Sequence, residues 1–154
     1  MSLEELESYG LERMTAAEIA DFLQTQNAGV LGLVAGGEPY MFPISFGFDG
    51  ERRLYFTYLV GSNSRKNELT RERETAGFLV YEVVSAFTWQ SVLLRGGIDH
   101  LPEGEWDDVS ALLDDAWNPE ILDRAKTEVD VAVCEFTIRE QTGVKHTGLP
   151  PGLR

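Results

Sequence analysis

The chain has 154 residues, of which 43% are hydrophobic and 25% are charged, a balance that supplies the core of one globular domain and excludes a coiled coil, a collagen or a disordered tail. Thirteen Lys and Arg residues against 26 Asp and Glu give a formal net charge of −13, so we expect neither nucleic acid nor a membrane surface as a partner, because this charge repels phosphates. The excess of acids, with few Lys among the cations, is typical of a halophilic protein or simply of an acidic one.

The first third of the chain predicts a helix and then a strand meander. The capping box Thr15-Ala16-Ala17-Glu18 and apolar residues at helical spacing predict a helix at about 15–26. Apolar runs that end at Gly36-Gly37, Asp49-Gly50 and a small-residue loop predict the next elements. These are strands over 29–34, 39–48 and 54–58.

The remainder alternates between helical and extended patterns. In chain order, we expect a short helix at 65–73, strands at 76–83 and 90–94, a helical insertion at about 103–127, a strand at 129–138 and an irregular tail at about 141–154. The 90–94 strand is expected to close on Gly96-Gly97, and the tail to be irregular because it is rich in Gly and Pro. Sequential strands without helical crossovers predict a mainly β single domain over 1–154, an antiparallel barrel that is closed or nearly closed.

Neither the cysteine nor the histidines predict a reactive or metal-binding centre. Cys134 lies in an apolar, strand-like run and is expected to be a core residue. His100 and His146 have no cysteine or histidine at ligand spacing, so we expect no metal site. We see no signal peptide and no membrane-spanning run, and expect a cytoplasmic protein.

The chemistry concentrates in one segment, Gly61-Ser62-Asn63-Ser64-Arg65-Lys66-Asn67. Arg65 and Lys66 fall in the first turn of the predicted helix, where cations are unfavourable unless an anion is bound. Backbone N–H groups, serine hydroxyls and the two cations would then converge on a phosphate. The alternative is a surface helix in which the cations pair with acids such as Glu68 and Glu72.

The surroundings favour the phosphate. The strand end Tyr55-Phe56-Thr57 leads, after a short loop, to Ser64-Arg65-Lys66. This order resembles the pyridoxamine 5′-phosphate oxidase-like family of FMN-binding split barrels, in which such cations hold the phosphate of FMN. The strands at 39–46 and 89–96 and the stretch from Phe136 to Gly143 also resemble the family. The resemblance implies a six-stranded antiparallel split β-barrel with peripheral helices.

The resemblance also implies a set of cofactor-binding residues. Arg65 and Lys66, with Ser64 and Asn67 beside them, would hold the phosphate, and Thr57 at the end of the Phe56-Thr57 strand would bond the phosphate or the ribityl chain. Pro43, Ile44 and Ser45 would line the edge of the isoalloxazine ring. Trp89, Gln90 and Ser91 would reach the phosphate or the ring, in the site of a second subunit. A homodimer with flavin sites at its interface is therefore expected, with exposed Trp106 and Trp117 contributing to the contact.

The chain also departs from the family. Phe42 and Gly47 stand where the oxidases have an Arg and a Lys, and the oxidases' C-terminal substrate motifs are absent. Oxidation of pyridoxine phosphate is therefore not expected. The alternatives are an FMN-dependent oxidoreductase of unknown substrate, a non-catalytic flavin carrier or sensor, a deazaflavin-binding barrel, and a barrel that has lost its ligand. Haem is disfavoured because only His100 and His146 are available as ligands.

Overall fold

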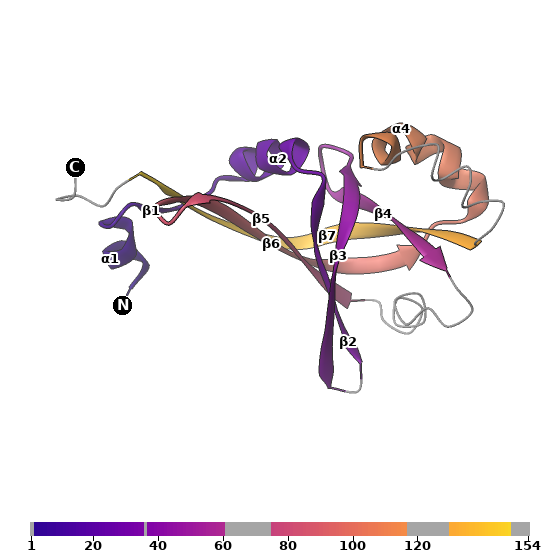
Figure 1. Cartoon of the computed structure of the whole chain (residues 1–154), viewed down its shortest axis with the longest axis horizontal. Helices are drawn as coiled ribbons and strands as arrows, with labels where there is room; N and C mark the ends of the chain where they lie inside the picture. The colour runs from indigo at the N-terminus through magenta and orange to yellow at the C-terminus, as the bar shows by residue number, and fades with distance from the viewer. Residues whose placement is uncertain (1, 36, 61–74, 117–129, 149–154) are drawn as a thin grey trace.

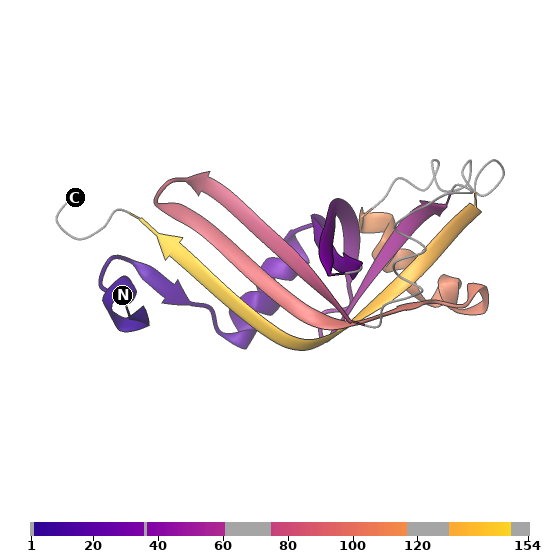
Figure 2. The same cartoon turned by 90° about the horizontal axis from the view of Figure 1, so that it is seen from below.

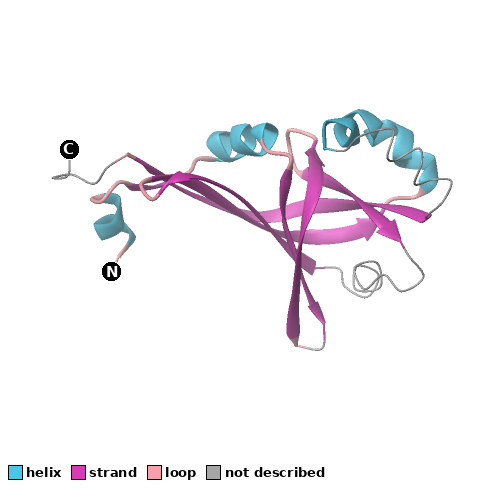
Figure 3. Cartoon of the chain, in the orientation of Figure 1, coloured by secondary structure: helices cyan, strands magenta, loops and turns pink. Residues whose placement is uncertain are grey.

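The computed structural model describes residues 2–35, 37–60, 75–116 and 130–148. Strands dominate them (Figure 3). The elements are α1 (Leu3–Glu7), β1 (Leu11–Arg13), α2 (Ala16–Thr25), β2 (Ala28–Ala35), β3 (Glu38–Phe48), β4 (Arg53–Val60), β5 (Thr75–Ser85), β6 (Thr88–His100), the 3₁₀ turn η1 (Glu103–Glu105), α4 (Trp106–Ala116) and β7 (Asp130–Thr147).

The sheet closes into a six-stranded antiparallel barrel, as the sequence predicted. Its strand order is β1-β7-β4-β3-β2-β5-β6, and an additional β6–β7 pairing closes the ring. The barrel is split because β7 pairs with β4 only as far as Thr137 and with β1 only from Val144, while its other edge follows β6. The long strands β5, β6 and β7 therefore run on together beyond the barrel (Figure 2).

Two helices pack on the sheet at different places: α2 in the barrel core and α4 against β3 and β4 (Figure 1). Thr15 and Glu18 form the predicted capping box of α2, which buries Ile19, Phe22 and Leu23 in the barrel core. That core also holds four phenylalanines, with ring centroids as close as 5.0 Å: Phe46, Phe56, Phe78 and Phe136. Since α2 fills the concave side of the sheet, we call this side the inner face and its opposite the outer face.

Two predicted boundaries were wrong, both at glycines. β6 does not end before Gly96-Gly97 but continues to His100. Gly96 lies so close to the paired strand β7 that a Cβ there would overlap the carbonyl group of Thr137. The predicted irregular tail is strand as far as Thr147. Gly143 lies inside this strand and packs closely against the start of α2, since a Cβ there would come within 2.9 Å of Met14 and Ile19. Both glycines mark close packing between elements rather than turns.

Other expectations lie outside the described residues: the helix at 65–73, the insertion beyond residue 116 and the tail from 149. Neither α1 nor β1 was predicted from the sequence. Ser2 and Glu5 form a second capping box at the start of α1. β1 pairs with the end of β7, at Leu11 opposite His146.

Candidate functional site

The outer face of the barrel carries a broad apolar surface. Cross-strand partners share a face of a sheet, so the register assigns each residue to one side. Outer-face positions include Met41, Leu79, Tyr81, Val83, Trp89 and Leu93. Met41 and Val83 are 68% and 64% exposed, which is unusual for apolar side chains of this size. This surface is a candidate for binding a ligand or another protein.

Register divides the predicted cofactor residues of β3 and β6 between the two faces. Pro43 and Ser45 on β3, with Trp89 and Ser91 on β6, lie on the outer face. The two intervening residues are turned inward: Ile44 packs against the barrel core, and Gln90 lies opposite Lys145, which pairs with Glu18 of α2. The ring of Phe56 is fully buried in the core, so only its main chain is available to a cofactor.

Thr57 supplies a polar group that the protein itself does not satisfy. Its side chain is 5% exposed, and its Oγ1 has no hydrogen-bond partner among the described residues. The β3–β4 ladder ends at the pair Phe46–Phe56. Thr57, which comes after Phe56 on β4, and Ser45, which comes before Phe46 on β3, therefore lie one position beyond the last pair. Buried hydroxyls are normally hydrogen-bonded, and this one fits a ligand that brings an acceptor or donor.

The segment that the sequence analysis assigned to phosphate binding follows β4 along the chain. Ser64, Arg65, Lys66 and Asn67 all lie outside the described residues. They stand in the connection between β4, which carries Thr57, and β5, which carries Leu79 and Tyr81 of the outer face. The connection therefore begins and ends on strands of the candidate site.

A single chain does not bring the two halves of the predicted site together. Thr57 pairs with Val133 on β7, whereas Ser91 pairs with Val144 on the same strand. Eleven residues of strand separate these positions, which corresponds to about 36 Å along β7. Trp89, Gln90 and Ser91 therefore lie far from Thr57 within one chain.

The two departures from the oxidase pattern both have structural explanations. The ring of Phe42 is buried in the core. Gly47 lies beneath α4, where an added Cβ would overlap the carbonyl group of Leu112. Neither position has room for an exposed cation in this arrangement. Trp106 was expected at an exposed contact, but it packs beside Val109 and donates its indole N–H to the Leu101 carbonyl over 2.9 Å.

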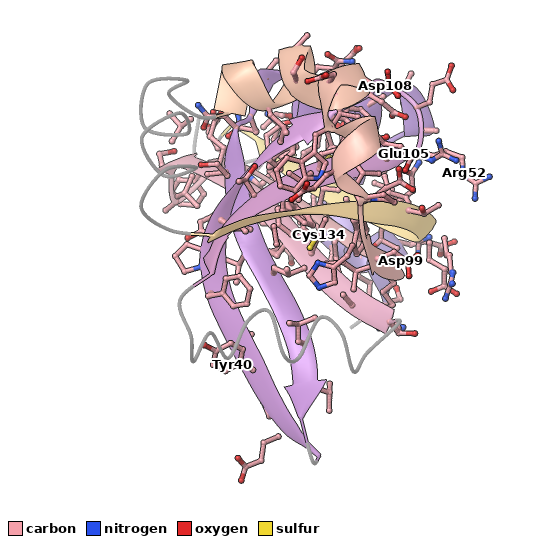
Figure 4. All side chains as sticks on the ribbon, turned by 90° about the vertical axis from the view of Figure 1, so that its right-hand side faces the viewer. Tyr40, Arg52, Asp99, Glu105, Asp108 and Cys134 are labelled. Carbon is pink, nitrogen blue, oxygen red and sulfur yellow. The ribbon has the colours of Figure 1, made fainter. Side chains whose placement is uncertain are left out.

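Between the start of α4 and the outer face lies a cleft of about 410 Å³. Asp99, Glu105 and Asp108 line it and lie on one side of the molecule (Figure 4). Tyr55 also lines the cleft. Burial raises its pKa, and the nearby charge and hydrogen bond of Glu135 raise this pKa further. The phenol therefore stays protonated and serves as a hydrogen-bond donor in this acidic cleft.

The sequence analysis did not identify the exposed apolar residues of β5, above all Tyr81 and Val83, as part of a candidate site. The signal was present, since the run Phe78-Leu79-Val80-Tyr81 is apolar on both faces. A strand of that kind is typical of a sheet covered on both sides. Its inner face meets the core through Phe78 and Val80, but no described element of the chain covers Tyr81.

The helices and the titratable side chains of the described residues bear on two further classes of site. None of their helices is long and apolar enough to cross a membrane. No group of three or more His, Cys, Asp or Glu side chains in the same part of the chain is arranged to hold a metal ion. Cys134 is buried in the core, with its Sγ 3.7 Å from Nδ1 of His100.

Solved structures share this fold at low sequence identity. A FAD-binding protein from Mesorhizobium loti has 22% identity, a TM-score of 0.68 and coverage of 89% of this chain and 99% of its own. A FAD-binding protein from Mycobacterium smegmatis has 12% identity, a TM-score of 0.62 and coverage of 89% and 99%. A FAD- and haem-binding protein from the same organism has 19% identity, a TM-score of 0.64 and coverage of 92% and 75%.

In sequence, no curated protein matches the chain. The sequence model of the pyridoxamine 5′-phosphate oxidase family, in contrast, matches residues 15–145. This match spans α2, the six barrel strands and α4, and it ends inside the strand that closes the split barrel. The chain therefore belongs to the pyridoxamine 5′-phosphate oxidase family.

Proposed function

We propose that this protein binds a flavin, FMN, on the outer face of its barrel and acts as a flavin-dependent oxidoreductase. The observation that carries the proposal is the exposed apolar outer face, on which Pro43, Ser45, Trp89 and Ser91 all lie. An aromatic ring system such as isoalloxazine fits a surface that is apolar with a few hydroxyl groups. Family membership and the FAD-binding proteins of the same fold support the choice of a flavin.

The polar end of the cofactor would be held at the other part of the site. Thr57 offers a buried hydroxyl that has no partner among the described residues. Arg65 and Lys66 would provide the positive charge that holds a phosphate. A chain of net charge −13 needs such a local concentration of cations to bind an anion. Ser64 and Asn67 would add hydrogen bonds from the same segment.

A homodimer would complete the site. About 36 Å of strand separates Ser91 from Thr57. Trp89 and Ser91, the outer-face residues of this part of β6, would therefore contribute to the site of a second copy. The exposed side chains of Met41, Tyr81 and Val83 would be buried between the two copies. Association of this kind removes apolar area from water, which stabilises the complex.

The flavin, when bound, would supply hydride or electron transfer. The residues of the chain would anchor its phosphate, exclude water from one face of the ring and hydrogen-bond its polar edge. The substrate and the electron donor are not specified by these residues, and a non-catalytic flavin carrier would use the same contacts. Turnover with a nicotinamide donor separates the two functions.

FAD is the second candidate, favoured by the names of the M. loti and M. smegmatis proteins. Its additional AMP group requires further surface beyond the phosphate. Arg95, exposed on the outer face, is a described cation that could contact a second phosphate there. Deazaflavin would make a similar demand for a broad basic groove.

The experiment is an absorbance scan from about 300 to 500 nm after incubation with excess flavin and removal of the unbound fraction. It is run in low and in molar salt, because we also propose that the acidic chain is adapted to high salt. Retained flavin bands, lost in an Arg65→Ala/Lys66→Ala variant, would support the proposal. An Arg13→Ala/Arg139→Ala variant removes the same charge from two exposed residues outside the proposed site and should keep the bands.

A colourless protein under both salt conditions, with FMN and with FAD, would refute flavin binding. Mass spectrometry of the released cofactor distinguishes FMN from FAD. We place the protein in the cytoplasm, where its single buried cysteine remains reduced. Detection of the native protein in an oxidising compartment would contradict that placement.

A further inference from the structure

His146, near the end of β7, contacts two carbonyl groups at once. Its Nδ1 lies 2.7 Å from the carbonyl oxygen of Phe87, and its Nε2 lies 2.9 Å from that of Tyr9. A carbonyl oxygen only accepts hydrogen bonds, so each of these bonds requires a proton on the imidazole. A neutral imidazole carries one such proton and an imidazolium carries two.

The surroundings of the ring accommodate the charged form. His146 is 9% exposed, and a buried cation is tolerated only when its donors are satisfied. The two carbonyls satisfy both. The ring of Trp89 is stacked beside it, with centroids 6.2 Å apart and planes at 23°, and an indole face attracts a cation. Gly10 covers the ring closely, since a Cβ there would lie 3.3 Å from it.

No carboxylate neutralises this imidazole within the described part of the chain. On the paired strands β1 and β7, Glu12 and Lys145 are the next residues along, and alternation turns them to the opposite face. There Lys145 pairs with Glu12, over 3.8 Å, and with Glu18 of α2. The phenol of Tyr9 is 57% exposed. The acids of α1, namely Glu4, Glu5 and Glu7, form no ion pair with His146.

We infer that His146 is a proton-dependent clasp. In its doubly protonated form it ties the segment before β1, through Tyr9, and the β5–β6 turn, through Phe87, to the end of β7. When it loses a proton, a nitrogen lone pair faces one of the carbonyl oxygens and that bond is lost. The clasp is therefore complete while both ring nitrogens carry protons and loosens when one of these protons is lost. This inference does not depend on flavin binding.

The clasp has a readout at the elements it joins. The amides of Leu11–Arg13 lie in the β1–β7 ladder, and the N–H of Gly148 bonds to the Phe87 carbonyl over 2.8 Å. Their exchange with solvent is measured by NMR between about pH 5 and about pH 8, where histidine ordinarily titrates. Protection factors, which remove the intrinsic pH dependence of exchange, should fall by about tenfold at these amides as one hydrogen bond to a charged group is lost.

Matched variants isolate the residue responsible. His146→Gln should make these protection factors independent of pH, because its side chain does not titrate. His100→Gln changes the other histidine of the chain and should leave the pH dependence intact. The same pH dependence in His146→Gln, or a flat profile in the native protein, would overturn the clasp.

A second measurement needs no variant of His146. With only two histidines in the chain, ring ¹⁵N resonances can be assigned by comparison with His100→Gln. The clasp requires that both nitrogens of His146 carry protons at the acidic end of the range and that one is lost on raising the pH. A ring that stays in one neutral tautomer throughout would refute it.

Discussion

Gly47 of β3 lies directly beneath the backbone of Leu112 in α4, so close that a Cβ on Gly47 would overlap the Leu112 carbonyl. Helix α4 packs on Tyr55 and Val133 of the outer face through Val109 and Leu113. The glycine therefore decides how closely the helix can approach the sheet, and the family's cation is excluded from this position by the same contact.

Gly47→Ala should destabilise the protein. The new methyl group must displace backbone, and overpacking of this kind typically costs about 1–3 kcal/mol. Urea unfolding measures the change in the free energy of unfolding. Gly104→Ala is the control, because a Cβ there meets nothing within 4 Å. Equal stability of the two variants would show that α4 does not depend on this contact.

Thr57→Val should separate ligand binding from stability. Valine keeps the branched shape but removes a buried hydroxyl that has no partner among the described residues. Loss of an unsatisfied group should leave the free energy of unfolding unchanged or raise it. If the hydroxyl bonds the flavin, affinity should fall by about tenfold, as for one lost hydrogen bond. Fluorescence titration with FMN measures this, and Thr57→Ser should retain the affinity. A valine variant that is less stable and binds normally would contradict the assignment.

Local signals predicted the elements that depend on local chemistry. The capping box of α2 and the turn at Asp49-Gly50 were both readable, because their hydrogen bonds lie within a few residues. Gly96 was wrongly predicted to end a strand, and Gly143 was wrongly predicted to lie in an irregular tail. Their reason is a contact with Thr137 or with Met14 and Ile19, far away in the sequence, which no local pattern contains.

For the candidate site, the sequence predicted which segments matter but not which side chains face outward. Pro43 and Ser45 lie on the outer face and Ile44 between them on the inner one, yet all three belong to one apolar strand. Only the pairing with β2 and β5 resolves this. The resemblance to the family supplied a set of candidate residues, and register was needed to divide them between the two faces.

Val83→Asp should prevent the proposed dimer. Val83 lies on the outer face opposite Trp89 and is 64% exposed, so a carboxylate there would have to be buried on association. Analytical ultracentrifugation should find a monomer. Val84→Asp is a matched control, because Val84 is 70% exposed but falls at the register shift between Val83 and Ser85 and not on the outer-face row. If both variants associate like the native protein, the outer face of β5 is not the interface.

The ion pair between Lys145 of β7 and Glu18 of α2 should give the stability a defined pH dependence. The hydrogen bond and charge of Lys145 lower the pKa of Glu18 below its usual 4.5, and Glu18 in turn raises the pKa of Lys145 above 10.5. A lowered carboxyl pKa means that its contribution is present above the unfolded value and is lost as pH falls through the folded one. The raised lysine pKa means that its contribution is present below the unfolded value and is lost as pH rises through the folded one.

Glu18→Gln should therefore lower the free energy of unfolding throughout the neutral range, and the difference from the native protein should shrink as pH falls below about 4.5. Thermal unfolding monitored between pH 3 and pH 8 measures it. Asp21→Asn removes one charge from the exposed side of the same helix, at a residue without an ion pair among the described residues, and should not reproduce this profile. A Glu18→Gln difference that is constant down to pH 3 would mean that the pair does not hold α2 against β7, and that the apolar contacts of Ile19, Phe22 and Leu23 alone do so.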